Sequence, residues 1–97
     1  MEIIDMDLLK KMAVTIGEAA KITGVPIRKL RYWEDKGIIQ SVDGAGNVTR
    51  KYDYYTIKKI ILIKELVDDG YVLDRAAEKV ELRIETLHEA FKKLEEK

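Results

Sequence analysis

Two short amphipathic segments, each ended by a glycine, follow one another directly near the start of the chain. The first reads "TIGEAAKITG", in which Thr15 and Glu18 fit the S/T-x-x-E capping box that begins a helix. Gly24 is a natural helix stop. The pattern predicts a helix over residues 16–23. Its expected buried stripe consists of Ile16, Ala19, Ala20 and Ile22.

The second segment reads "VPIRKLRYWEDKG" and begins with the turn residue Val25. Pro26 suits the first turn of a helix, where its missing N–H costs nothing, and Gly37 ends that helix after Lys36. Ile27 and Leu30 lie three apart, so we expect them to pack against the first helix. Two short helices joined by a tight glycine-containing turn predict a helix-turn-helix.

The pattern then changes to β-branched and aromatic runs, "IIQSV" and "VTRKY", separated by the turn cluster "DGAGN". Such runs around a glycine-containing turn predict a β-hairpin. After a helix-turn-helix, this hairpin would be a wing.

Three further helices are predicted in the remainder of the chain. Asp53 is a candidate N-cap for a helix over residues 54–69, which Gly70 ends. Residues 73–80 predict a fourth short helix, with Leu73, Ala76, Ala77 and Val80 inward. The final helix carries apolar residues at the a and d spacing of a coiled coil. These candidate dimerisation residues are Val80, Ile84, Leu87, Phe91 and Leu94. The alternative is that they fold back on their own domain.

The expected fold class is mainly α, a winged helix-turn-helix with a small β-hairpin wing and a short C-terminal helix. We expect an N-terminal extension over residues 1–14, the winged domain over residues 15–80 and the C-terminal helix over residues 81–97. The extension can form a short amphipathic helix. Its apolar residues are Ile3, Ile4, Leu8, Leu9 and Met12.

The net charge is zero, but the charges are unevenly distributed. Residues 15–64 hold ten Lys/Arg against five Asp/Glu, whereas residues 65–97 hold six against ten. This asymmetry favours a basic working surface with an acidic appendage. The alternative is a solvated charged surface.

Several functional classes are disfavoured by composition. The chain has no cysteine, which excludes disulfides, thiolate metal sites and thiol catalysis. His88 is the single histidine, and no phosphate-binding glycine loop is present. We therefore predict no enzyme, no catalytic residue, no metal and no cofactor. The chain shows neither a signal peptide nor an apolar run near the roughly 18 residues of a membrane span, so we expect a cytoplasmic, nucleoid-associated protein.

Cations and aromatic residues crowd the second helix of the pair and recur in the wing. Arginine can bond guanine edges, lysine can neutralise phosphate, and a tyrosine hydroxyl can reach phosphate oxygen. The candidate DNA-binding residues are Thr15, Arg28, Lys29, Arg31, Tyr32, Trp33, Arg50, Lys51 and Tyr52. Alternatives stay open: Trp33 in the core, Tyr52 closing the wing, and Tyr54 and Tyr55 as packing residues or the lining of a small-molecule pocket.

The segments "TIGEAAKITGVPIRKLRYWEDKGII", "TRKYD" and "IKKIILIKELVDDGYVL" resemble the DNA-binding domain of the MerR family of bacterial transcription regulators. The resemblance covers roughly residues 15–80. It implies a winged helix-turn-helix, a homodimer built by a C-terminal antiparallel coiled coil, and binding to palindromic promoter DNA, which many members distort to activate transcription. It also implies RNA polymerase as a partner.

The sequence departs from the family pattern at several positions. Pro26 replaces the usual N-cap serine, and Lys29 takes a position that is often threonine. Val67, Asp69 and Val72 also differ from the usual residues. The chain ends soon after the fourth helix, so it is either a small stand-alone regulator or part of a longer one. Two alternative functions remain: an architectural, excisionase-like DNA-bending protein, and a winged-helix protein-interaction module.

Overall fold

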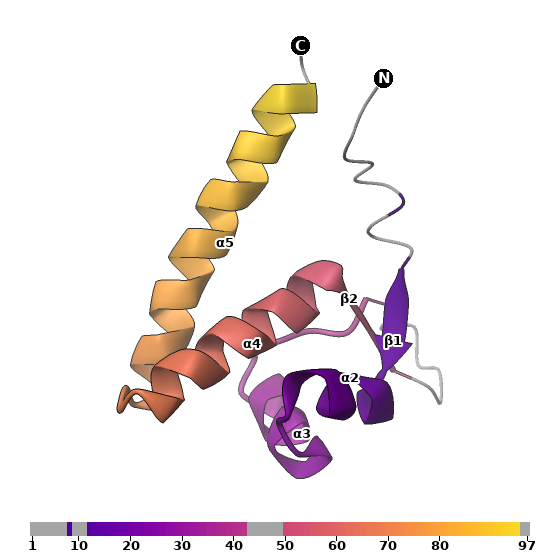
Figure 1. Ribbon diagram of the computed structural model, residues 1–97, viewed down its shortest axis with the longest axis vertical. Coiled ribbons are helices and arrows are strands. Elements are labelled where there is room, and N and C mark those ends of the chain that lie inside the picture. Colours follow the sequence, from indigo (N-terminus) through magenta and orange to yellow (C-terminus); the bar gives the residue numbers. More distant parts are fainter. Residues whose placement is uncertain (1–7, 9–11, 43–49, 96–97) are drawn as a thin grey trace.

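The structure is a computed structural model that describes residue 8, residues 12–42 and residues 50–95 (Figure 1). Its elements in chain order are β1 (Ala13–Thr15), α2 (Ile16–Thr23), α3 (Ile27–Asp35), β2 (Lys51–Asp53), α4 (Tyr54–Asp68) and α5 (Leu73–Glu95). Figure 1 shows α2 and α3 on one side of α4, and the two strands beside them. The mainly α fold with a small antiparallel sheet confirms the predicted winged helix-turn-helix class.

The predicted helix pair is confirmed, with caps where local sequence placed them. The Thr15 hydroxyl accepts a hydrogen bond from the Glu18 N–H at 3.2 Å, and the Glu18 carboxylate accepts one from the Thr15 N–H at 2.9 Å. This reciprocal bonding is the capping box. Gly24 then ends α2 with φ 77°, a left-handed conformation that a residue with a Cβ adopts only at a cost.

Two predicted core residues of the helix pair lie outside instead. Ile22 is 56% exposed and Ile27 is 39% exposed. Their places in the core are taken by Thr23 and Trp33, next to the correctly predicted Leu30. Thr23 can be buried because its hydroxyl donates to the Ala19 carbonyl at 2.8 Å.

The predicted hairpin is corrected. Residues 38–42 form no regular strand in the part of the chain that is described, and Ile38 and Ile39 are buried in the core. β2 pairs instead with β1, antiparallel, with Val14 opposite Tyr52. One backbone bond, from the Val42 N–H to the Lys51 carbonyl at 2.9 Å, links the two sides of the wing. The predicted turn, residues 43–47, and the first two residues of the predicted strand after it lie outside the described residues.

The N-terminal extension was predicted to end at residue 14, but β1 crosses that boundary. Ala13 and Val14 therefore belong to the sheet that carries the wing strand. Of the expected amphipathic helix, the structure describes only Leu8 and Met12, both exposed, and the rest lies outside the described residues.

α4 begins as predicted, since the Asp53 carboxylate accepts from the Thr56 N–H at 3.0 Å. The next prediction is wrong: residues 73–80 and the final helix form one helix, α5, of 23 residues. No glycine or proline interrupts residues 73–95, and Val80 belongs to both predicted stripes, so the helical phase continues. Figure 1 shows the C-terminal half of α5 extending beyond the other elements.

The core lies between α3, α4, the wing strand and the first half of α5. Its fully buried large side chains are Leu30, Ile39, Tyr52, Ile60, Ile63 and Val80. Because α3 supplies Leu30 and Trp33 to this core, its opposite face is left at the surface. No helix in the described part of the chain is long and apolar enough to cross a membrane.

Candidate nucleic-acid interface

The outer face of α3 gathers three cations and a tyrosine. Arg28, Lys29, Arg31 and Tyr32 are all exposed, and Tyr32 is 54% exposed. They face outward because Leu30 and Trp33 take the inward positions of this nine-residue helix. An exposed helix of this length fits the major groove of B-DNA, where arginine can read guanine edges.

The cations on this face have no acidic partner within the part of the chain that the structure describes. Among the described residues, no acid lies within ion-pair distance of Arg28, Lys29 or Arg31. Most other cations close to the helix do have partners: Lys36 pairs with Asp74 at 2.8 Å, and Lys64 pairs with Asp68 at 2.7 Å. The outer face of α3 therefore presents three cations, without an acidic partner in the described ranges, to a phosphate backbone.

The wing strand contributes a second group of cations. Arg50 and Lys51 are exposed at the start of β2. Both were predicted as DNA-binding residues, and their exposure is compatible with that role.

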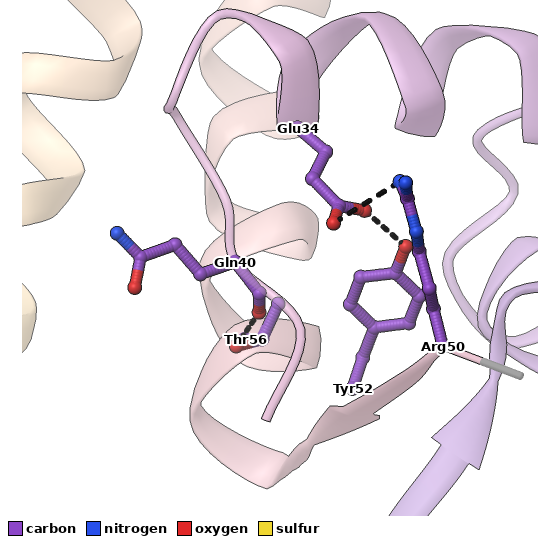
Figure 2. Close-up of polar contacts among 5 residues, drawn as sticks. All are labelled: Glu34, Gln40, Arg50, Tyr52 and Thr56. Carbon is purple, nitrogen blue, oxygen red and sulfur yellow. Dashed lines mark hydrogen bonds and ion pairs between the residues drawn. The ribbon is translucent and has the colours of Figure 1, made fainter. Parts of the chain in front are cut away.

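Tyr52, by contrast, is buried to 1% exposure. Its hydroxyl donates to Oε1 of Glu34 at 2.5 Å, while Nη1 of Arg50 lies 3.3 Å from Oε2 of the same carboxylate (Figure 2). Burial, and next the bond to Glu34, raise the pKa of the Tyr52 hydroxyl above its ordinary value. The hydroxyl therefore remains a donor. Because the Tyr52 hydroxyl donates its hydrogen bond to Glu34, it links the wing strand to α3 in place of the predicted bond to phosphate.

Trp33 is also removed from the candidate contacts, because its side chain is only 5% exposed. It lies three residues after Leu30, on the same face of α3, and that spacing places both in the core. The core alternative is the one that the structure supports.

The hydroxyl of Thr15 is engaged at the start of α2. Besides its capping bond, Thr15 Oγ1 donates to Oε1 of Glu18 at 3.1 Å. The backbone and hydroxyl bonds from Thr15 lower the pKa of Glu18. The side chain of Thr15 is thus used to begin the helix, and a DNA contact would have to coexist with that bonding.

Glu34 is the residue that sequence reasoning missed. The available signal was the acidic end of a helix whose first turns are cationic, because an acid beside DNA is unfavourable unless it has another use. Its two partners come from β2 and its flank, sixteen and eighteen residues later, so no local pattern could have identified them.

The predicted dimerisation residues divide into two groups. Val80 is fully buried in the core of its own chain, so it is unavailable to a partner, and Ile84 packs against that core. Leu87 and Leu94 are exposed, at 42% and 64%. The side chain of Phe91 lies outside the described residues.

Aromatic residues meet where α4 begins beside α5. The rings of Tyr55 and His88 have centroids 5.4 Å apart, and Tyr54 packs edge-on against Tyr55 at 5.8 Å. Tyr55 and His88, with Val42, Asp53, Thr56 and Ile84, line an open hollow of about 430 Å³. Among the described residues, no group of three His, Cys, Asp or Glu side chains could hold a metal ion.

Comparison with known proteins gives a family match. The model of the MerR HTH family regulatory proteins matches residues 14–82, from within β1 to within α5. The chain is 39% identical over 56 residues to an HTH-type transcriptional activator SoxR homolog from Chromobacterium violaceum, covering 58% of this chain and 37% of that protein.

Two further relatives carry similar names. An HTH-type transcriptional regulator CueR from Escherichia coli is 28% identical over 69 residues, covering 71% of this chain and 51% of that protein. The HTH-type transcriptional regulator TnrA from Bacillus subtilis is 28% identical over 60 residues, covering 62% of this chain and 54% of that protein. The chain thus matches between about a third and about half of the length of these relatives.

Proposed function

Because this chain belongs to the family of MerR HTH regulatory proteins, we propose that it is a transcription regulator that binds double-stranded DNA with sequence preference. The observation that carries the proposal is the outer face of α3, where Arg28, Lys29 and Arg31 are exposed without an acidic partner among the described residues. In this proposal α3 enters the major groove, and Arg50 and Lys51 hold the neighbouring backbone.

The four contacts on α3 divide by chemistry. Arg28 and Lys29 lie in the first turn of the helix, and recognition helices commonly contact base edges with their N-terminal residues. We assign sequence discrimination to Arg28, with a contribution from Lys29. Arg31 and Tyr32 lie further along, and we assign them to phosphate.

The proposed assembly is a homodimer. The exposed leucines Leu87 and Leu94 lie on the half of α5 that extends beyond the rest of the fold (Figure 1). A second α5 would cover them, and two subunits would then read two half-sites of a palindromic sequence. In this proposal the domain that reads DNA ends near residue 80, and residues 81–97 serve assembly.

The proposal extends to a non-enzymatic role in the cytoplasm, with RNA polymerase as the second partner. Support for the last point is limited to a relative that is named a transcriptional activator. Transcription from a promoter that carries the bound sequence, with and without the protein, measures it directly.

The test of DNA binding begins with selection of duplexes from a random-sequence library by the purified chain. Fluorescence anisotropy then gives the affinity for the selected duplex and for a shuffled one across a salt series. We expect preference for the selected duplex, and affinity that falls steeply with salt because phosphate contacts release counterions. Salt-dependent binding to duplex DNA without enrichment of any sequence would favour an architectural DNA binder. No binding at low salt would refute the proposal.

A further inference from the structure

Glu34 is an acid placed where a DNA-binding surface should avoid one. It lies on α3 one turn after the buried Leu30, at the edge of the outer face, and its side chain is 16% exposed. A carboxylate near phosphate weakens binding by like-charge repulsion. Its position therefore needs a benefit that offsets this cost.

Each of the two carboxylate oxygens of Glu34 contacts a side chain of the wing. Oε1 accepts from the Tyr52 hydroxyl at 2.5 Å, and Oε2 lies 3.3 Å from Nη1 of Arg50 (Figure 2). Arg50 comes directly before β2 and Tyr52 lies within it, and both side chains reach the same carboxylate (Figure 2). The two contacts join the wing strand to α3 across a separation of sixteen to eighteen residues in sequence.

The two partners differ in what they can still do. Tyr52 is buried, and its one hydroxyl donor is used in the hydrogen bond to Glu34. The side chain of Arg50 is 53% exposed, and its Nη1 lies 3.3 Å from Oε2 of Glu34. Because a guanidinium has five N–H donors, the others remain for a phosphate oxygen.

We propose that Glu34 is a positioning residue for DNA recognition. It fixes the wing strand against α3 and presents the Arg50 guanidinium in one orientation, which sets how well the two elements match a particular sequence. An arginine that is ordered in advance loses less conformational freedom on binding. This inference rests on the proposed DNA-binding function.

The proposal predicts effects of opposite sign on two kinds of DNA. Removal of the negative charge strengthens binding to any duplex, because general affinity follows charge. The contacts of Glu34 with Tyr52 and Arg50 form a clamp between α3 and the wing strand. Removal of this clamp weakens binding to the preferred duplex, because α3 and the wing strand are then no longer held in one relative position. A residue that is only repulsive would change both affinities upward, and a residue that only supports folding would change both downward.

The experiment compares Glu34→Gln with Asp35→Asn. Asp35 is the exposed neighbour of Glu34 on α3, so its substitution makes the same change in net charge without touching the clamp. Anisotropy measures the affinity for a duplex that the wild-type chain selects from a random library and for a shuffled duplex. We expect Glu34→Gln to lower the ratio of the two affinities roughly tenfold, the size of one charge-assisted hydrogen bond. Asp35→Asn should leave the ratio unchanged.

A second variant separates the clamp from the charge. Tyr52→Phe keeps the ring in the core and removes only the hydroxyl, so it should lower the ratio without raising affinity for the shuffled duplex. Circular dichroism confirms that each variant is folded, and if Glu34→Gln is not, Tyr52→Phe decides. Equal shifts on both duplexes for the folded variants would overturn the role of Glu34. A wild-type chain that selects no duplex would refute the sequence-specific recognition on which this inference rests.

Discussion

The ammonium group of Lys36 lies 2.8 Å from Oδ1 of Asp74, so the residue that ends α3 is bonded to the first turn of α5. Lys36 also lies over the ring of Tyr32, 5.6 Å from its centroid. One cation thus touches the proposed DNA-binding face and the helix proposed for dimerisation.

Alkaline pH should weaken this link. The hydrogen bond that Lys36 donates to Asp74 is the main reason that the pKa of Lys36 is raised above its ordinary value. A raised lysine pKa in the folded state contributes stability that is fully present below the unfolded pKa of about 10.4 and is lost as pH rises through the folded pKa. NMR titration of the lysine side chains should show a raised pKa that Asp74→Asn returns toward normal. Glu85→Gln, an exposed acid on the same helix, should leave it unchanged.

Acidic pH should weaken the start of α2 by the converse effect. Bonds from Thr15 lower the pKa of Glu18, so the contribution of Glu18 is present above the ordinary carboxyl pKa of about 4.3 and is lost as pH falls through the lowered value. The free energy of unfolding, measured by urea titration at several pH values, should depend on acid less steeply in Glu18→Gln than in the wild type. An unchanged pH dependence would contradict the assignment.

Thr15→Ala should destabilise the fold by about 1 kcal/mol, the usual cost of losing an N-cap hydroxyl. Thr15→Ser should recover most of this loss, since serine offers the same acceptor to the Glu18 N–H. The comparison by urea denaturation isolates the cap, because both variants shorten the same side chain.

Trp33→Phe should lower stability by about 1–3 kcal/mol, through lost burial and the space that the smaller ring leaves. The ratio of the affinities of this variant for the selected and the shuffled duplex should equal that of the wild type. The Trp33 side chain is only 5% exposed, so it offers little surface for contact with DNA. Trp33 is the only tryptophan, so its fluorescence also reports on burial. Strong quenching by acrylamide in the folded chain would contradict the core placement.

Arg28→Ala should lower discrimination between duplexes, by about 1–3 kcal/mol if the arginine reads guanine bidentately. Arg31→Ala should weaken both duplexes alike and reduce the slope of log affinity against log salt by about 0.9. Arg83→Ala, an exposed arginine on α5, serves as the control for loss of a cation elsewhere. Equal losses for Arg28→Ala and Arg31→Ala on every duplex would remove the division between base and phosphate contacts.

Leu87→Asp should dissociate the proposed homodimer, because it places a charge in the apolar stripe of α5. Sedimentation equilibrium should then give the mass of a monomer. Leu82 is more exposed, at 67%, and lies on another face of the same helix, so Leu82→Asp should leave the dimer intact. A wild-type chain that is monomeric at all concentrations would refute the assembly.

Features that depend only on residues close in sequence were predictable. The capping box of Thr15 and Glu18, the stop at Gly24 and the N-cap at Asp53 each depend on residues within a few positions. The exposed cations of α3 were also predictable, because Leu30 orients the helix.

Features that depend on distant partners were not. Val14 and the stretch at Ile38 are both β-branched, and nothing local says which of them pairs with Tyr52. The clamp at Glu34 was missed for the same reason. The break predicted in α5 was an error of a different kind, since no helix-stopping residue between Leu73 and Glu95 justified it.

The pairing of β1 with β2 has a consequence for the order of folding. Thr15 faces Lys51, so the sheet closes a loop that contains the whole helix pair. Closing about 35 residues costs roughly 3 kcal/mol of chain entropy beyond a constant. The helices α2 and α3 need no such closure to begin forming. The sheet should therefore form after them on the folding pathway, and its amides should be among the first to exchange with solvent deuterium.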